Sequence, residues 1–162
     1  MNKVKVLMVC MGNICRSPLA HGVFERMVKE EGLSDLIEVD SSGTHSWHVG
    51  NPPDPRSQEV AMRHGLDLNY QQARKVTSAD IDDYDYILAM DRDNLEILQA
   101  LAKNKESLNK IALFLDFAEG IELSEVPDPY YGGPGGFDHV YELVEAAASG
   151  LLQSINQRFN KS

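Results

Sequence analysis

Residues 4–24 read VKVLMVCMGNICRSPLAHGVF. The almost continuous apolar run over residues 3–10 is typical of a buried parallel strand. Ser17 and Pro18 then predict the start of a helix, with Ser17 as the N-cap and Pro18 at the first helical position. Apolar residues recur with the helical period as far as Gly32, which ends the pattern. The stretch therefore predicts a strand, a short loop and a helix in succession.

The rest of the chain continues this alternation. Further buried strands are expected at residues 36–41, 84–90 and 110–115, and helices from residue 54 to near residue 65 and at residues 77–80, 91–103 and 137–159. Loops rich in Gly and Pro separate them at residues 45–55 and 116–136. Because strands alternate with helices, we expect an α/β fold with a mostly parallel sheet. The length of 162 residues fits a single domain over residues 1–162, at roughly 150 residues per domain.

The composition limits the classes of partner and compartment. The chain has 15 basic and 25 acidic side chains, a formal net charge of −10. Nucleic acids and anionic membranes need a basic face, so the charge argues against both as partners. No apolar run approaches the roughly 20 residues of a membrane helix, and the N-terminus does not fit a signal peptide. The two cysteines are too few for a disulfide scaffold, which favours the reducing cytoplasm.

The loop between the first predicted strand and helix has the composition of a phosphate site. Its backbone amides can curl inward around an anion, and the start of the following helix adds partial positive charge. Gly12 allows the backbone to come close, and Asn13 tolerates a left-handed turn. Arg16 can hold two phosphate oxygens, and these positive surroundings favour the thiolate of Cys10 as a nucleophile. The expected phosphate-binding residues are Met11, Gly12, Asn13, Ile14, Cys15 and Arg16.

Simpler interpretations exist for single residues of the sequence. A lone Cys10 would be interpreted as a core cysteine and a lone Arg16 as a surface charge. Their spacing on one loop between a strand and a helix favours the phosphate site instead. His45 and His48 lie three residues apart, but no cysteine or carboxylate set completes a metal site around them. We therefore expect loop histidines, no metal and no cofactor.

At these motifs the chain resembles the low-molecular-weight protein tyrosine phosphatases, over essentially its whole length. The resemblance rests on VCMGNICRSP at residues 9–18, the region of Ser41, residues 47–56 and 84–91, and DPYY at residues 128–131. It implies a four-stranded parallel sheet flanked by helices, with the phosphate-binding loop after the first strand. It also implies hydrolysis through a phosphocysteine intermediate.

The resemblance further implies roles for individual residues. Cys10 matches the nucleophile, Arg16 the phosphate-binding arginine and Asp128 the general acid and base. The residues that match those fixing the loop are Asn13, Ser17 and Ser41. The residues that match the substrate slot are Trp47, Tyr130 and Tyr131. Cys15 matches a cysteine that can bridge to the nucleophile under oxidation. Relatives often carry an acid where this chain has His21, a difference that affects no catalytic role. Sequence spacing does not tie Asp128 to Cys10, so this pairing depends on the resemblance.

The expected function is the hydrolysis of phosphotyrosine and aryl phosphate monoesters, which releases inorganic phosphate. Phosphotyrosine proteins are the expected substrates, and a tyrosine kinase is a further expected partner because Tyr130 and Tyr131 match tyrosines phosphorylated in some relatives. Two alternatives use the same scaffold. One is an arsenate reductase, which would need a cysteine relay with only Cys15 available, and the other is an arginine-phosphate phosphatase. A non-catalytic phosphate-binding module or phosphoryl carrier is the alternative from another class.

Overall fold

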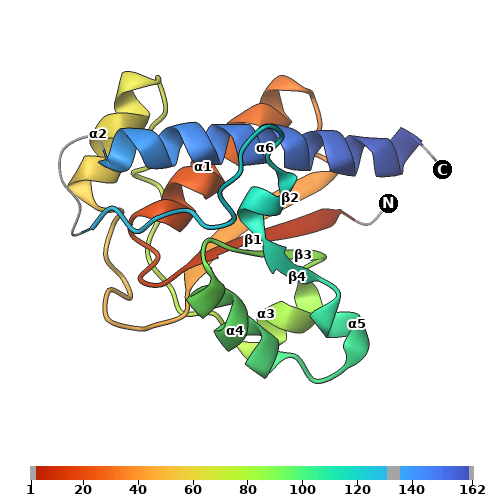
Figure 1. Ribbon diagram of the computed structural model, residues 1–162. Helices are drawn as coiled ribbons and strands as arrows, with labels where there is room; N and C mark the ends of the chain where they lie inside the picture. The colour runs from red at the N-terminus through yellow and green to blue at the C-terminus, as the bar shows by residue number, and fades with distance from the viewer. Residues whose placement is uncertain (1–2, 131–135, 161–162) are drawn as a thin grey trace.

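The computed structural model describes residues 3–130 and 136–160, which contain a four-stranded sheet. Its strands are β1 (Val4–Cys10), β2 (Ile37–Gly43), β3 (Tyr86–Ala89) and β4 (Ile111–Leu113), in the spatial order β2-β1-β3-β4. Every neighbouring pair is parallel, and Met8 in the central strand β1 lies between Ser41 and Leu88. The predicted α/β fold with a four-stranded parallel sheet is confirmed (Figure 1).

Helices cover both faces of the sheet (Figure 1). One face carries α1 (Arg16–Glu30), α2 (Pro55–Arg63) and α6 (Gly136–Asn160), and the other carries α3 (Ser78–Asp83) and α4 (Arg92–Leu101), with α5 (Lys105–Leu108) beside them. Val6 and Met8 of β1 pack with α1 and α6, whereas Leu7 and Val9 pack with α3 and α4. Because both faces are covered, β1 is apolar at nearly every position, as its sequence shows.

Most of the predicted helix starts are confirmed. Asp54 accepts a hydrogen bond from the second residue after it and caps α2, and Asp91 caps α4. Thr77 and Asp80 form a reciprocal capping box at α3. The structure adds two elements that the sequence pattern did not predict, α5 and the 3₁₀ helix η1 (Phe114–Phe117). The local capping chemistry therefore predicts where a helix begins better than where a short turn of helix is inserted.

The start of α1 differs from the prediction. The helix begins at Arg16 after an N-cap at Cys15, and no side-chain hydrogen bond caps it. Ser17, predicted as the N-cap, lies inside the first turn, and its hydroxyl contacts Cys10 and Asn13 instead. The prediction was wrong because these contacts within the loop occupy the hydroxyl that a cap would use. The first helical amides are consequently not taken by a serine cap and remain available to an anion.

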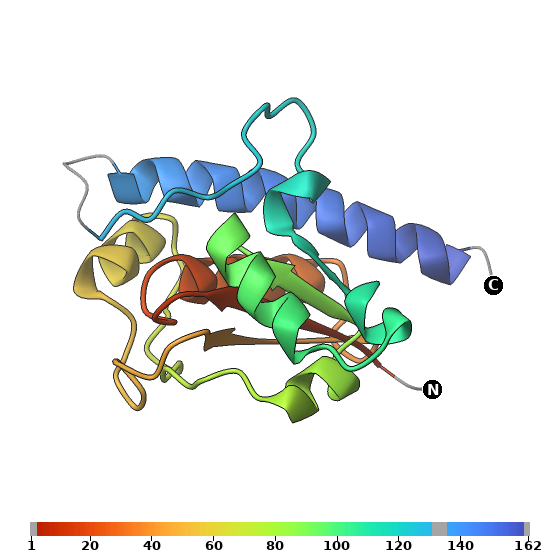
Figure 2. The ribbon, with the colours of Figure 1, turned by 60° about the horizontal axis from the view of Figure 1, so that its bottom comes forward.

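The loops after β1, β2 and β3 meet at one end of the sheet (Figure 2). Met90, directly after β3, donates its amide to the Val9 carbonyl at 3.0 Å. The carbonyl of Met90 accepts the amide of Val126 at 2.7 Å, which draws the long segment before α6 back to this end of the sheet. The phosphate loop and the segment that carries Asp128 are thereby brought together.

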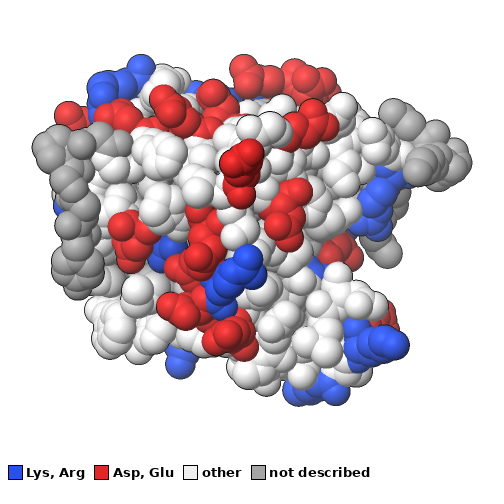
Figure 3. All heavy atoms as spheres, in the orientation of Figure 1, with Lys and Arg blue, Asp and Glu red and all other residues white. Residues whose placement is uncertain are grey.

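The acidic residues are unevenly distributed. Residues 116–145 contain eight Asp and Glu and no Lys or Arg. Figure 3 shows acidic side chains in a column down one face of the molecule, over the region where Figure 1 places η1, the segment after it and α4. In the two described ranges, none of the helices has both the length and the apolar character needed to cross a membrane.

Candidate active site

The phosphate loop is a compact turn from the end of β1 to the start of α1. Asn13 has a φ of 57°, in the left-handed region that its short polar side chain tolerates. Three amides from outside the loop donate to its carbonyls: Thr44 to Cys10 at 2.9 Å, His45 to Met11 at 3.0 Å and Asp54 to Ile14 at 2.7 Å. At Gly43 an added Cβ would lie 2.7 Å from the Met11 carbonyl oxygen, so only glycine fits beside the loop. These bonds hold the loop from outside and use its carbonyls rather than its amides, which suits an anion nest.

Cys10 lies at the base of this loop, with 2% of its surface exposed. Its Sγ is 3.0 Å from the Oγ of Ser17. Ser17 Oγ accepts a hydrogen bond from Nδ2 of Asn13 at 2.7 Å, which leaves its own proton to donate. The carbonyl of Ser42 is a more distant acceptor at 3.5 Å. A hydroxyl proton directed at the sulfur stabilises the thiolate relative to the thiol.

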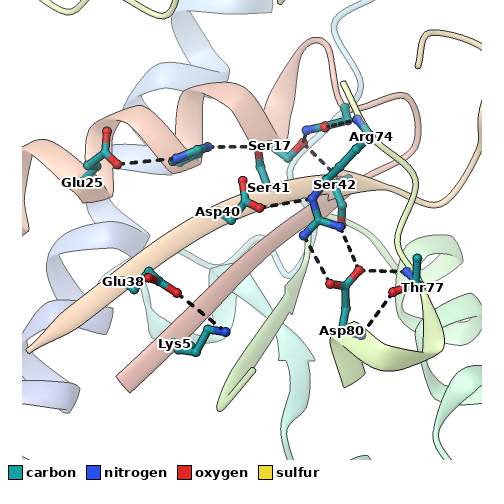
Figure 4. Close-up of polar contacts among 12 residues, drawn as sticks. Lys5, Ser17, Glu25, Glu38, Asp40, Ser41, Ser42, Arg74, Thr77 and Asp80 are labelled. Carbon is teal, nitrogen blue, oxygen red and sulfur yellow. Dashed lines mark hydrogen bonds and ion pairs between the residues drawn. The ribbon is translucent and has the colours of Figure 1, made fainter. Parts of the chain in front are cut away.

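Asn13 is fixed in turn by Arg74, a residue that the sequence analysis missed. The amide of Arg74 donates to Oδ1 of Asn13 at 3.0 Å. The guanidinium of Arg74 binds Asp40 of β2 at 3.1 Å and Asp80 of α3 at 2.9 Å, as Figure 4 shows. The chain of contacts runs on through Ser17 to the sulfur of Cys10. No local pattern marks Arg74 for this role, because Asn13 and Asp40 lie 61 and 34 positions away in the sequence.

Arg16 is almost fully buried beside the loop. Its Nη1 donates to Oδ2 of Asp91 at 2.6 Å and to the carbonyl of Val126 at 3.0 Å. Burial by itself lowers the pKa of Arg16, but Cys10, Asp91 and Asp128 together raise it above its ordinary value. The guanidinium is therefore a permanent positive charge in a site largely screened from water. Asp91, which the sequence indicated only as a helix start, fixes its direction.

Asp128 reaches the same site from the segment before α6. Its Oδ2 lies 3.7 Å from Nη2 of Arg16, and its Oδ1 accepts the amide of Tyr130 at 3.0 Å. About a third of its side chain is exposed, so the carboxyl can meet both a substrate and water. The structure thus brings Asp128 to the loop of Cys10, which sequence spacing alone could not do.

A cavity of about 290 Å³ joins these groups. Its lining includes Cys10, Arg16, Asp128, Trp47, His48 and Tyr130. Trp47 is 69% exposed and stacks on His45, with ring centroids 4.5 Å apart. The aromatic residues predicted for a substrate slot therefore border the same opening as the phosphate loop, while Tyr131 lies outside the described residues.

His48 also borders this cavity, although the sequence analysis treated it as an ordinary loop histidine. Its ring lies 6.4 Å from the ring of Tyr130, and its Cδ2 would be 3.0 Å from a Cβ added at Gly12. Within the described ranges, no group of three or more His, Cys, Asp or Glu side chains is arranged to hold a metal ion. His48 thus belongs to the rim of the cavity rather than to a metal cluster among these residues.

Ser41 has a different neighbour from the one expected. Its Oγ lies 3.0 Å from Nδ1 of His21, a buried histidine on α1 whose Nε2 is 3.7 Å from Glu25 (Figure 4). The residue whose carbonyl faces Ser17 is the next one in β2, Ser42. Support of the phosphate loop by Ser41 stays a prediction, and any such support would pass through His21 and α1.

Cys15 is buried at the end of the loop as a free thiol. Burial, followed by the nearby charge of Asp54, raises the pKa of Cys15 far above its ordinary value. Burial also raises the pKa of Asp54, but hydrogen bonds from Arg56 and from Cys15 lower it overall. Cys15 is accordingly held as a neutral thiol beside an ionised carboxylate.

Comparison with known proteins gives the family of the chain. The family model described as low molecular weight phosphotyrosine protein phosphatase matches residues 5–161. The chain belongs to this family. Its similarity to other low molecular weight phosphatases spans bacteria and animals. The chain is 42% identical over 154 residues to the low molecular weight protein-tyrosine-phosphatase YfkJ of Bacillus subtilis, covering 95% of this chain and 97% of that protein. It is 40% identical to the human low molecular weight phosphotyrosine protein phosphatase, over 91% of this chain and 93% of the human protein.

Solved structures of relatives share the fold. The crystal structure of Bacillus subtilis YfkJ matches with a TM-score of 0.92 and 40% identity, over 98% of each chain. The crystal structure of the Drosophila arginine phosphatase matches with a TM-score of 0.86 and 35% identity, over 94% of this chain and 98% of that one. Proteins of this fold thus include one named an arginine phosphatase, so the fold alone does not fix the substrate.

Proposed function

We propose that this low molecular weight phosphatase hydrolyses phosphotyrosine in proteins through a phosphocysteine intermediate. One observation carries the proposal: a buried cysteine, a buried arginine and an aspartate line one cavity whose rim is aromatic. Cys10 serves as the nucleophile, Arg16 binds the phosphate and Asp128 transfers the protons. The domain that performs this reaction spans residues 1–162, of which the family model matches residues 5–161.

In the first step the thiolate of Cys10 attacks phosphorus in line with the bond to the phenolic oxygen. The S–P bond forms as the P–O bond breaks, and the carboxyl of Asp128 gives its proton to the leaving oxygen. Arg16 and the loop amides hold the three other phosphate oxygens, where charge is concentrated during transfer. Asp91 holds Arg16 in place at 2.6 Å, so that little rearrangement is needed.

In the second step a water molecule replaces the phenol. The carboxylate of Asp128 takes a proton from this water as its oxygen attacks phosphorus. The S–P bond breaks, inorganic phosphate leaves and the thiolate of Cys10 is restored. The hydroxyl of Ser17, 3.0 Å from the sulfur, stabilises this thiolate as the leaving group.

The aromatic rim supports phosphotyrosine over other phosphate monoesters. A planar phenol ring can stack against Trp47 and Tyr130, whereas a flexible alkyl chain gains less from such contacts. The test is kcat/KM for matched peptides that carry phosphotyrosine, phosphoserine or phosphoarginine. Preference for phosphotyrosine is expected, and preference for phosphoarginine would assign the chain to the other chemistry of this scaffold.

Catalysis itself is tested with p-nitrophenyl phosphate and the Cys10→Ser variant. Wild type should turn this substrate over, and the variant should bind phosphate without turnover. If wild type shows no turnover while both proteins bind phosphate equally, the chain is a phosphate-binding module. A phosphocysteine that forms but does not hydrolyse would make it a phosphoryl carrier.

We further propose that the protein is cytoplasmic and redox-regulated. The two free cysteines support a reducing compartment, because a low-molecular-weight thiol pool keeps such cysteines reduced there. Peroxide would convert Cys10 to a sulfenic acid, and attack by the sulfur of Cys15 would then form a disulfide and release water.

A tyrosine kinase is a proposed partner that would phosphorylate Tyr130 or Tyr131.

A further inference from the structure

Two arginines hold the segment that carries Asp128. They bind backbone carbonyls that lie two residues before and two residues after the aspartate. Two residues before it, the carbonyl of Val126 accepts Nη1 of Arg16 at 3.0 Å. Two residues after it, the carbonyl of Tyr130 accepts Nη1 of Arg56 at 3.1 Å. Asp128 thus lies between two fixed points, and only the first of them belongs to the phosphate-binding machinery.

Arg56 has contacts that make it a stiff support. Its Nε and Nη2 bind both carboxylate oxygens of Asp54, at 3.0 and 2.9 Å. Its guanidinium also lies over the rings of Tyr130 and Phe137, at 5.2 and 4.7 Å from the ring centroids. Asp54 in particular raises the pKa of Arg56, so the guanidinium keeps its charge. The guanidinium of Arg56 is planar, so binding Asp54 through Nε and Nη2 also fixes the direction of Nη1. Nη1 donates to the carbonyl of Tyr130.

The other end of this support is the phosphate loop itself. The amide of Asp54 donates to the carbonyl of Ile14 at 2.7 Å. A continuous line of hydrogen bonds therefore runs from Ile14 through Asp54 and Arg56 to Tyr130. Since Arg16 is the first residue of α1, directly after the phosphate loop, both arginines locate Asp128 relative to the loop that would hold the phosphate.

We propose that Arg56 is a positioning residue for proton transfer by Asp128. It makes no contact with the reacting atoms, and it sets where the carboxyl stands relative to the leaving oxygen. The inference rests on the proposed function, because it requires Asp128 to be the acid. Misplacement of a catalytic group by about 1 Å can cost about 100-fold in rate, so a support of this kind has a measurable effect.

The test uses the dependence of kcat/KM on the leaving group. The phenolate of phenyl phosphate needs a proton as it leaves, whereas the dinitrophenolate of a dinitrophenyl phosphate leaves readily as the anion. In Arg56→Met, kcat/KM for phenyl phosphate should fall about 10- to 100-fold. Its kcat/KM for dinitrophenyl phosphate and its inhibition constant for inorganic phosphate should stay within about twofold of wild type. The ratio of the two rates on one preparation does not depend on the fraction of folded protein.

Two further variants sharpen the test. Arg56→Lys keeps the charge but cannot bind Asp54 through two nitrogens and also reach Tyr130, so it should show most of the same loss. Arg63→Met is the matched control. Arg63 lies on the same helix, and its ion pair at 3.0 Å is with Asp138 of α6 rather than with the segment of Asp128. Its leaving-group ratio should equal that of wild type.

The double variant Asp128→Asn with Arg56→Met separates the two roles. If Arg56 acts through Asp128, Arg56→Met should cause no further loss once Asp128→Asn is present. Losses that multiply, or a fall in Arg56→Met that is equal for both substrates, would overturn the role of Arg56 alone. If Asp128→Asn itself has no leaving-group dependence, the acid role fails, and the inference about Arg56 fails with it.

Discussion

Oδ2 of Asp91 lies 2.6 Å from Nη1 of Arg16, although 75 residues separate the two in the chain. Oδ1 of the same carboxylate accepts the amide of Asn94 at 2.8 Å and caps α4. One aspartate therefore starts a helix on one face of the sheet and orients the phosphate-binding arginine at the end of the sheet. Any movement of α4 relative to β1 would therefore displace the guanidinium of Arg16.

Asp91→Asn should weaken both stability and catalysis. Asparagine is an equally good N-cap, so the change removes the charge and keeps α4. The buried guanidinium loses its ionic partner, and the free energy of unfolding in urea should fall by about 1–3 kcal/mol. Loss of the fixed direction of Arg16 should lower kcat/KM for an aryl phosphate about tenfold. Asp93→Asn, at an exposed position in the same turn, is the control, and equal effects of both variants would contradict the role of Asp91.

Ser17→Ala should reduce the reactivity of Cys10. The hydroxyl at 3.0 Å from the sulfur is lost, and a hydrogen bond to a charged group is worth roughly 1.5–3 kcal/mol. The sulfur of Cys10 then lacks the hydrogen-bond donor that stabilises its anionic form, so kcat/KM and the rate of alkylation by iodoacetate should both drop about tenfold or more. Ser46→Ala, in an exposed part of the loop after β2, should change neither rate. An unaltered alkylation rate in Ser17→Ala would show that the hydroxyl does not stabilise the sulfur.

Arg74→Met should make the phosphate loop less rigid and leave the position of Asp128 unchanged. Without its contacts to Asp40 and Asp80, the backbone of residue 74 no longer holds Asn13 as firmly. We expect kcat/KM to fall about tenfold for good and poor leaving groups alike, with a matching rise in the inhibition constant of phosphate. Arg158→Met, which removes an arginine paired with Tyr86, is the control. A leaving-group dependence in Arg74→Met would argue against this assignment.

Disulfide formation between Cys10 and Cys15 should be limited by the second thiol. Because burial and Asp54 raise the pKa of Cys15, little of it is thiolate near neutral pH, and the fraction rises as pH rises. After brief peroxide treatment, the rate of disulfide formation followed by mass spectrometry should therefore increase with pH. Asp54→Asn removes one cause of the raised pKa and should accelerate closure at a fixed pH. The disulfide would protect Cys10 from irreversible oxidation, so full recovery of peroxide-treated Cys15→Ser by reductant, equal to wild type, would contradict this role of Cys15.

The acid-rich segment over residues 116–145 predicts that the protein prefers phosphopeptides with basic residues near the phosphotyrosine. Glu125 lies next to Val126, whose carbonyl accepts a hydrogen bond from Arg16, so part of the acid-rich segment adjoins the site. Peptides with basic residues beside phosphotyrosine should have a lower KM than those with acidic residues, and salt at about 0.5 M, roughly three times the physiological ionic strength, should reduce the difference. A preference that does not change with salt would have to come from contacts other than long-range charge.

The α/β fold and half of the site follow from local patterns. The strand, the loop and the helix over residues 4–24 are contiguous, so the spacing of Cys10 and Arg16 is enough to place both on one phosphate loop. The alternation of apolar strands with capped helices predicts a parallel sheet. Each crossover helix returns the chain to the end of the sheet at which the previous strand began, so the next strand runs in the same direction. Only the resemblance to a family connected Asp128 with this loop.

Ser17 shows why a local pattern can mislead. A serine before a proline at the start of a helix fits an N-cap by every sequence criterion. In the folded chain its hydroxyl lies between Cys10 and Asn13, and the helix begins two residues earlier than predicted, at Arg16. The preference for a cap is worth about 1 kcal/mol, and contacts made by the folded loop outweigh it.

The sequence by itself determined the four strands, the longer helices and the loop that carries Cys10 and Arg16, because these depend on neighbours within a few residues. Only the tertiary structure decided that Asp91, Arg74 and Arg56 support this loop and its acid. Their contacts join residues 61 to 75 positions apart, and no helical or strand period encodes such a separation. They exist because parallel strands end at one edge of the sheet and bring distant loops within hydrogen-bonding distance there.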